Sequence, residues 1–328
     1  MTVADLTVER VAAAVERLLP EAVPVRPVGV LRKGRSHASW MLDSGLGRLV
    51  GKVGLHGDRA VALRRLDEHR RVWEHGVPVP RLLGFTAASS VVGDRLLIVA
   101  EYLTGQDAED SRSLPSGVMG EAMYSAGAAL AGLHGVPVEC FGDSDSGLDR
   151  GFATWGAAVS SRVELLARAY SERGGSLDWE VEGLVAAGLV LLGRLADEVS
   201  VVVRPAVAHL DVYLPNILLD AEGCFRALLD LEHVRWVDPV MDFVKPAMWM
   251  FEDQPWWAER FVCGYRSVGG WPQLWSERLA VATGLELLTG VNYWTRVRDL
   301  SMREDYVRRL RVWVRSDGVD GVWPATAW

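Results

Sequence analysis

The chain has 328 residues, of which 49% are hydrophobic and 24% are charged. This balance excludes an intrinsically disordered chain, because such chains lack the apolar residues needed for a core. The length allows two lobes with a cleft between them. The formal net charge of −8 argues against non-specific nucleic-acid binding, which needs a surplus of basic side chains on one face.

The three cysteines, Cys140, Cys224 and Cys263, are odd in number and widely spaced. They indicate neither a disulfide framework nor a zinc site. The first residues lack a basic segment followed by an apolar core, and the longest uncharged helical stretch, Gly183 to Gly193, is shorter than the roughly 20 residues of a membrane-spanning helix. We therefore expect a soluble, cytoplasmic protein that acts without a membrane and without an obligate protein partner.

The first hundred residues alternate helical and strand patterns. Glycines separate short apolar runs in a way typical of antiparallel strands, and a Gly-Val-Pro-Val-Pro segment ends the second helical stretch. The predicted elements, in chain order, are a helix at 8–19, strands between 28 and 53, a helix at 59–75, and strands at 82–86 and 96–102.

Beyond Gly105 the helical period dominates. The predicted helices cover 118–134, 153–170, 178–199, 241–265 and 274–314, with a β-like patch at 201–234. We therefore expect an α+β fold with two lobes. Residues 1–104 would form a small lobe with an antiparallel sheet and a helix, and residues 105–328 a larger, mainly helical lobe.

The segment between His209 and Asp230 carries the most informative pattern. An apolar run ends at His209 and Asp211, a loop leads to Asn216, and two short apolar strands then surround an Asp-Ala-Glu-Gly turn. Because an antiparallel hairpin brings its two ends together, Asn216 and Asp230 should face one site. An amide oxygen and a carboxylate suit Mg²⁺, and Asp211 would lie where a substrate hydroxyl approaches a general base. This arrangement fits phosphoryl transfer.

The pattern His209-x-Asp211-x-x-x-x-Asn216, followed by a hairpin and Asp230, resembles the catalytic loop of the aminoglycoside phosphotransferase and choline kinase-like family, a relative of the protein kinases. Three other segments resemble that family: Gly76–Leu83 its G-V-P-V-P-R segment, Leu130–His134 its L-A-x-L-H helix end, and Val237–Phe243 its G-D-P-x-x-D-L segment. The stretch 141–155 resembles the hygromycin B phosphotransferases more weakly. The resemblance implies a protein kinase-like fold and transfer of the γ-phosphate of ATP or GTP, with Mg²⁺, to a hydroxyl group.

Matching positions to the family implies a role for each residue of the loop. Asp211 becomes the catalytic base, and Asn216 and Asp230 become the magnesium ligands. His209 is expected to brace the loop by hydrogen bonds rather than to transfer protons. For Glu232, contact with a second metal or a substrate and simple solvation of a turn remain equally open.

The family also needs a strand lysine that holds the α and β phosphates. The chain contains three lysines among 35 basic residues: Lys33, Lys52 and Lys245. Lys52 alone has a strand context, and Lys245 receives no role. A compact ammonium in so arginine-rich a chain favours a specific task, with a solubilising edge-strand residue as the alternative. Glu68 is the candidate carboxylate that tethers Lys52, and Asp67 and Glu74 remain open.

Two further segments are expected to contact the nucleotide. Ser36 lies in the glycine- and serine-containing turn 32–39, whose backbone amides would cover the phosphates. The backbone from Glu101 to Leu103 would act as a hinge that hydrogen-bonds the base.

The sequence predicts the substrate less specifically than the reaction. Acidic residues at Asp143, Asp145 and Glu252 would suit a polycationic aminoglycoside, although acidic loops are common in an acidic protein. We expect an antibiotic O-phosphotransferase that acts on an aminoglycoside or a related sugar or nucleoside antibiotic and confers resistance. The alternatives are a metabolic kinase for a small alcohol such as choline, homoserine or a thioribose, and a non-catalytic binding protein on the same scaffold.

Overall fold

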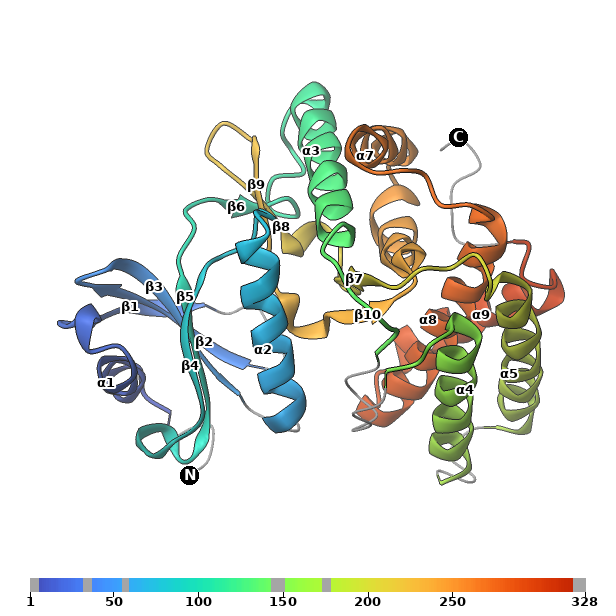
Figure 1. The fold of residues 1–328 in the computed structure, drawn as a ribbon, viewed down its shortest axis with the longest axis horizontal. Helices are drawn as coiled ribbons and strands as arrows, with labels where there is room; N and C mark the ends of the chain where they lie inside the picture. The colour runs from blue at the N-terminus through green and yellow to red at the C-terminus, as the bar shows by residue number, and fades with distance from the viewer. Residues whose placement is uncertain (1–5, 32–36, 55–58, 143–150, 173–177, 321–328) are drawn as a thin grey trace.

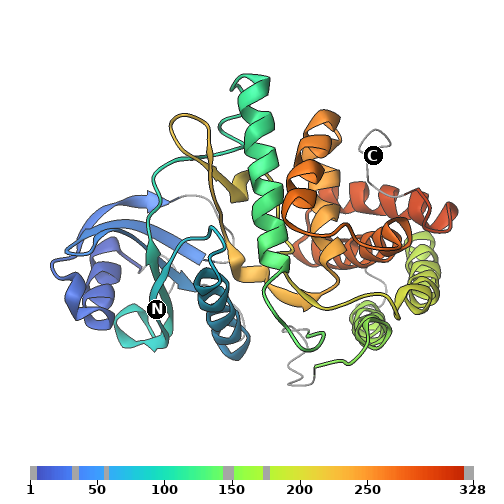
Figure 2. The same cartoon turned by 45° about the horizontal axis from the view of Figure 1, so that its top comes forward.

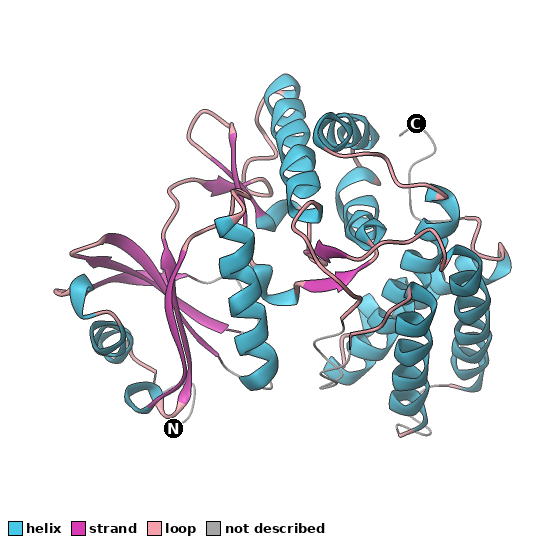
Figure 3. Cartoon of the chain, in the orientation of Figure 1, coloured by secondary structure: helices cyan, strands magenta, loops and turns pink. Residues whose placement is uncertain are grey.

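The computed structural model describes residues 6–31, 37–54, 59–142, 151–172 and 178–320 (Figure 1). Its largest sheet lies at one end of the molecule and most of its helices lie toward the other, as the colours of Figure 3 show. The predicted α+β fold, with an N-terminal antiparallel sheet and a larger helical part, is confirmed.

The N-terminal part is a five-stranded antiparallel sheet in the order β1-β2-β3-β5-β4. Its elements are α1 (Val8–Leu18), β1 (Arg26–Leu31), β2 (His37–Ser44), β3 (Gly47–Gly54), α2 (Arg59–Glu74), β4 (Leu82–Ser89) and β5 (Arg95–Glu101). α1 and α2 pack on opposite faces of the sheet, each with its own hydrophobic cluster.

Alternation along β3 sets the position of Lys52. Leu49 and Val53 are buried in the cluster under α1, so Lys52 between them points to the other face. Its cross-strand partner Ile98 belongs to the cluster under α2. The lysine therefore leaves the sheet on the α2 side, where Asp230 of the C-terminal part lies within hydrogen-bonding distance.

The C-terminal part contains seven helices among the described residues and two small sheets. The helices are α3 (Ser116–His134), α4 (Trp155–Ser171), α5 (Trp179–Val199), α6 (Val244–Pro246), α7 (Pro255–Val268), α8 (Trp275–Val297) and α9 (Leu300–Arg315). The strands are β6 (Gln106–Asp107), β7 (Ala206–Ala208), β8 (Ile217–Leu219), β9 (Phe225–Leu228) and β10 (Arg235–Val237), paired as β6-β8-β9 and β7-β10. No helix among the described residues is long and apolar enough to cross a membrane.

The helical pattern predicted over 241–265 is interrupted in the structure. The chain there forms a 3-10 turn, the short helix α6, a π turn at Ala247–Phe251 and then the separate helix α7. Pro255 lacks an N–H donor and therefore begins α7 instead of continuing the preceding turn.

The helical pattern predicted over 274–314 forms two helices, α8 and α9. α8 ends at Val297, because Arg298 adopts a left-handed conformation with φ of 60°. Asp299 then caps α9 by accepting a hydrogen bond from the Met302 N–H at 3.2 Å. An aspartate before an amphipathic segment is a helix-start signal that the periodicity alone does not reveal.

The division into residues 1–104 and 105–328 remains our proposal for the two lobes. It is supported by the end of the large sheet at Glu101 and by the pairing of Gln106 and Asp107 with β8 in the second part.

Two glycines bring α3 and α7 close together, side by side in Figures 1 and 2. A Cβ atom on Gly127 would collide with the Phe261 carbonyl oxygen, and one on Gly264 would collide with the Tyr124 carbonyl oxygen. This crossing holds α7 against α3, the helix that ends at His134.

We predict that Gly264→Ala lowers the free energy of unfolding by about 3 kcal/mol, since backbone atoms on the facing helix cannot move aside as a side chain could. Gly132→Ala, on α3 with open space around its Cβ, is the matched control and should raise stability by roughly 0.5–1 kcal/mol. Urea unfolding measures both. Equal effects of the two substitutions would contradict the close crossing.

Candidate active site

The predicted hairpin lies at the centre of the candidate site. β8 and β9 pair antiparallel, and the Leu229 N–H donates to the Asn216 carbonyl oxygen at 2.8 Å. At the other end, Gly223 takes a φ of 83°, which suits a glycine in the tight turn. The hairpin thus places Asn216 and Asp230 at the same open end.

The loop before the hairpin is held by a buried carboxylate. Asp242, in the 3-10 turn Pro239–Phe243, is 1% exposed. It accepts hydrogen bonds from the N–H groups of His209 at 2.7 Å and Leu210 at 2.5 Å. His134 Nε2 lies 2.9 Å from the same carboxylate. Leu210 takes a left-handed φ of 62°, a conformation that this pair of hydrogen bonds helps to hold.

His209 connects the loop to the hairpin. Its side chain is completely buried, and its Nε2 lies 2.8 Å from the Leu229 carbonyl oxygen, directly before Asp230. This contact supports the bracing role proposed for the residue.

Both carboxylate oxygens of Asp211 have partners. The Asn216 Nδ2 donates to Oδ2 at 2.9 Å, and the Lys245 ammonium donates to Oδ1 at 2.6 Å. Burial alone would raise the pKa of Asp211, but the neighbouring Lys245 ammonium holds that pKa below its ordinary value. Asp211 is therefore an ionised carboxylate at neutral pH, as a proton acceptor must be.

Lys245 is the site residue that the sequence interpretation missed. It follows Asp242 by three residues, so the helical turn that anchors the loop also carries Lys245 to it. Its Nζ lies 5.6 Å from the centroid of the Trp249 ring. The signal available in the sequence was its rarity, since the chain has only three lysines.

Lys52 and Asp230 link the two parts of the molecule. Lys52 Nζ lies 3.1 Å from Asp230 Oδ1, with both side chains about 30% exposed. Burial alone would lower the pKa of Lys52, but the Asp230 carboxylate raises it above its ordinary value, so the ammonium stays charged. Asp230 takes a left-handed φ of 64°, which is uncommon for a non-glycine residue and concentrates at functional sites.

Glu68 pairs with Arg71 among the described residues, not with Lys52. The Arg71 Nη2 lies 2.5 Å from its carboxylate. Arg71 also donates to the Pro137 carbonyl oxygen and lies over the Trp236 ring at 5.6 Å. The described contacts therefore attach Glu68 to the C-terminal part through Arg71, and its role as the tether of Lys52 stays a prediction.

Two other acidic candidates have basic partners. Glu232 Oε2 lies 2.6 Å from His37 Nδ1 at the start of β2. Burial alone would raise the pKa of Glu232, but the hydrogen bond and charge of His37 lower it to about 2. Glu252 pairs with Arg309 on α9 at 2.7 Å. Glu232 thus lies next to Asp230 and contacts the sheet, whereas Glu252 is fixed to a C-terminal helix.

The residues predicted to form the hinge lie at and just after the end of β5. The Glu101 carboxylate accepts a hydrogen bond from the Arg81 N–H at 2.7 Å, so its side chain is occupied by the β4 side of the sheet. Leu103 follows as a half-buried residue, and a base contact would come from the backbone. Three other predicted residues, Ser36, Asp143 and Asp145, lie outside the described residues.

Asn216 and Asp230 fit a magnesium ion. The Asn216 Nδ2 donates to the Asp211 carbonyl and carboxylate oxygens, which leaves the amide oxygen for a ligand. Mg²⁺ commonly takes one or two protein ligands together with phosphate oxygens and water. Within the described part of the chain, no group of three or more His, Cys, Asp or Glu side chains forms a metal site.

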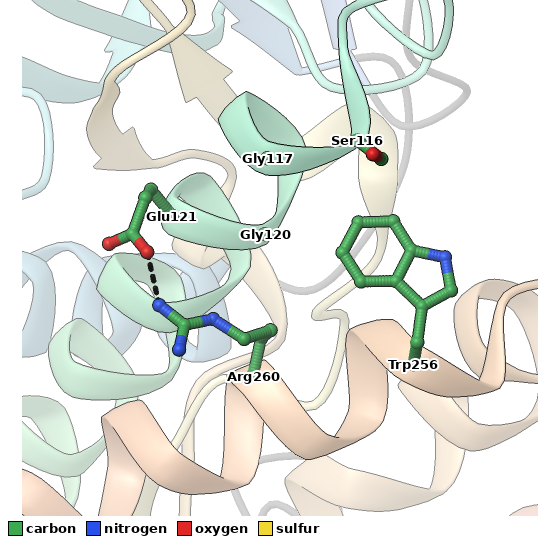
Figure 4. A pocket seen from close by; sticks show the side chains of 6 residues that line it. All are labelled: Ser116, Gly117, Gly120, Glu121, Trp256 and Arg260. Carbon is green, nitrogen blue, oxygen red and sulfur yellow. Dashed lines mark hydrogen bonds and ion pairs between the residues drawn. The ribbon is translucent and has the colours of Figure 1, made fainter.

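A hollow of about 440 Å³ lies between α3 and α7, outside the candidate active site (Figure 4). It is lined by Ser116, Gly117, Gly120, Glu121, Trp256 and Arg260, and Glu121 forms an ion pair with Arg260 across it. None of the predicted site residues lines it.

Comparison with known proteins identifies the family. A model of the phosphotransferase enzyme family named APH matches residues 28–275. The chain belongs to this phosphotransferase family. Membership confirms the predicted resemblance and the predicted enzyme class, a phosphotransferase with a hydroxyl acceptor. No curated protein sequence matches the chain.

Solved structures of aminoglycoside phosphotransferases share the fold of this phosphotransferase. APH(4)-Ia is 17% identical with a TM-score of 0.68, and the match covers 93% of this chain and 99% of that chain. A ternary complex of a thermostable APH(4)-Ia mutant with AMP-PNP and hygromycin B is 16% identical, with a TM-score of 0.68 and coverage of 93% and 98%. A gentamicin complex of APH(2")-IIa is 16% identical, with a TM-score of 0.61 and coverage of 94% and 96%. The protein kinase-like fold predicted from the sequence is thereby confirmed.

We predict that Asp242→Ala lowers the free energy of unfolding by at least about 3 kcal/mol, because two buried N–H groups of the loop lose their acceptor. Asp253→Ala, at an exposed position eleven residues later, is the control and should change stability by less than about 0.5 kcal/mol. Urea unfolding of the three proteins measures the difference. Equal stability of the two variants would show that Asp242 does not hold the loop.

Proposed function

We propose that this phosphotransferase is an antibiotic O-phosphotransferase that transfers the γ-phosphate of ATP or GTP to a hydroxyl of an aminoglycoside or a related sugar or nucleoside antibiotic. The observation that carries the proposal is the meeting of Asp211, Asn216 and Asp230 at one end of the hairpin, with Lys52 bound to Asp230. Resistance to the antibiotic and action in the cytoplasm belong to the same proposal.

The chain's own residues account for the chemistry. Asp211 accepts the proton of the acceptor hydroxyl as that oxygen bonds to the γ-phosphorus, and the bond between the γ-phosphorus and the bridging oxygen breaks with its electron pair left on the nucleoside diphosphate. Lys52 would neutralise charge on the α and β phosphates. Asn216 and Asp230 would hold Mg²⁺, which when bound neutralises charge on the β and γ phosphate oxygens.

The antibiotic class draws support from the structures that share the fold. The APH(4)-Ia complex contains hygromycin B and the APH(2")-IIa complex contains gentamicin. Among the described residues, Trp249 and Tyr213 lie edge to face 5.8 Å apart near Lys245 and Asp211. Such aromatic faces suit the apolar faces of a sugar ring.

The test is a screen for nucleoside diphosphate release with aminoglycosides, nucleoside antibiotics and small amino alcohols, each with ATP and with GTP. We expect turnover with an antibiotic, and a loss of about 10²- to 10⁴-fold in Asp211→Asn, which keeps the shape but not the proton acceptor. Turnover only with a small metabolite would overturn the antibiotic proposal. Unchanged turnover in Asp211→Asn would overturn the mechanism.

A separate prediction concerns the metal. Asn216→Ala and Asp230→Asn should raise the Mg²⁺ concentration needed for half-maximal nucleotide binding by about 10- to 100-fold, because each removes or weakens an oxygen ligand. Asp220→Asn, at the turn end of the same hairpin, keeps the oxygen that caps the turn and should leave the Mg²⁺ requirement unchanged. An equal Mg²⁺ requirement in all three variants would contradict the assignment of Asn216 and Asp230 as magnesium ligands.

A further inference from the structure

Lys245 occupies a position that the proposed function leaves unused. Its ammonium lies 2.6 Å from Asp211 Oδ1, while the other carboxylate oxygen is bound by Asn216 on the side of the proposed metal. The Lys245 and Asp211 side chains are only 20% and 16% exposed. Two charges so far removed from water contribute little net stability, so the pair calls for another explanation.

The surrounding contacts fix this ammonium in place. Asp242, three residues earlier, is hydrogen-bonded to the loop that carries Asp211. Trp249, four residues later, places its ring beneath the ammonium. Glu286 on α8 adds a second negative charge near Lys245, and it is itself held by the Tyr306 hydroxyl at 2.9 Å. Lys245 is therefore a positioned cation and not a mobile surface lysine.

The chemistry of the step places the transferred group beside this cation. A hydroxyl that gives its proton to Asp211 must lie within hydrogen-bonding distance of a carboxylate oxygen, and the γ-phosphorus must lie in line with that hydroxyl. An ammonium has three donors, of which the Asp211 bond uses one. Since the ammonium lies 2.6 Å from Asp211, a hydroxyl bound to this carboxylate brings the attacking oxygen and the equatorial phosphoryl oxygens close to the remaining donors.

We propose that Lys245 is a catalytic residue whose ammonium bridges Asp211 and the transferred phosphoryl group. The lysine remains protonated throughout the step: the hydroxyl proton goes to Asp211, and the electron pair of the broken bond stays on the nucleoside diphosphate. Its contribution is to stabilise the charge on the phosphoryl oxygens while keeping the base oriented. This inference rests on the proposed phosphoryl transfer and names a residue that was not part of it.

The primary test is nucleotide selectivity, which needs no acceptor. We expect Lys245→Met to weaken binding of Mg·AMP-PNP by about tenfold, the loss typical of a charge-assisted hydrogen bond, and to leave binding of Mg·ADP within about twofold. Because both nucleotides are titrated against the same variant, partial unfolding cancels in the ratio. Arg260→Met, which breaks the ion pair with Glu121 in the hollow of Figure 4, is the control and should leave both affinities unchanged.

A double variant separates direct contact from simple charge balance. If Lys245 touches the phosphoryl group, Lys245→Met should still weaken Mg·AMP-PNP relative to Mg·ADP in an Asp211→Asn background. If the lysine only neutralises Asp211, its effect should vanish there, and this result would overturn the proposal. Lys245→Arg keeps the charge and should recover only part of the selectivity, because its planar fork places the donors differently from a compact ammonium.

Turnover gives the second measurement. Once an acceptor is known, Lys245→Met should lower kcat by about 10²-fold with an acceptor KM changed by less than about threefold. A wild-type protein that binds no nucleotide would refute the proposed function itself. A wild-type protein that is active, with Lys245→Met equally active, would refute only the role of Lys245.

Discussion

The contact between the Asp242 carboxylate and two successive backbone N–H groups, those of His209 and Leu210, determines the geometry of the site. A carboxylate with both oxygens available can accept from neighbouring amides only if the chain turns sharply, and Leu210 accordingly has a positive φ. That turn directs Asp211 toward Asn216 and places the His209 ring against the Leu229 carbonyl. These hydrogen bonds therefore hold the loop and the hairpin in one fixed arrangement relative to Asp242.

The segment that carries Asp242 is also bound to two helices that are distant in the sequence, α3 and α8. His134 at the end of α3 contacts Asp242, and Asp238, four residues before it, forms a buried bidentate pair with Arg278 of α8 at 2.6 and 3.0 Å. Such buried pairs have high desolvation costs, so their value lies in specifying one arrangement more than in adding stability. Backbone positions in the loop thus depend on packing between α3, α7 and α8, and the close crossing at Gly127 and Gly264 is part of that dependence.

The sequence predicted the local parts of this arrangement and missed the long-range ones. The hairpin was predictable, because a turn between two apolar runs brings the strand ends together whatever surrounds it. The partners of Lys245 and Glu68 were not predictable. Lys245 binds Asp211 and Glu68 binds Arg71, and whether either side chain finds such a partner or faces solvent depends on how the elements pack in three dimensions. The two breaks within the predicted helical segments have local signals of another kind: Pro255 at the first turn of α7 and the Asp299 cap of α9 mark helix starts that a helical period alone does not show.

Lysines of this arginine-rich chain compensate the negative charge of the site. Two of its three lysines bind the carboxylates at the centre of the site, Lys52 to Asp230 and Lys245 to Asp211. In the function that we propose, a nucleotide brings several negative charges to a place that already holds two carboxylates, and without compensating cations the repulsion would oppose its binding. A guanidinium would tend to take both oxygens of a carboxylate through its planar fork, which would block the oxygen needed for a metal or a proton. A compact ammonium contacts one oxygen and leaves the other to a second partner, as Asp211 shows by binding Lys245 through Oδ1 and the Asn216 amide through Oδ2. This difference favours lysine at both positions.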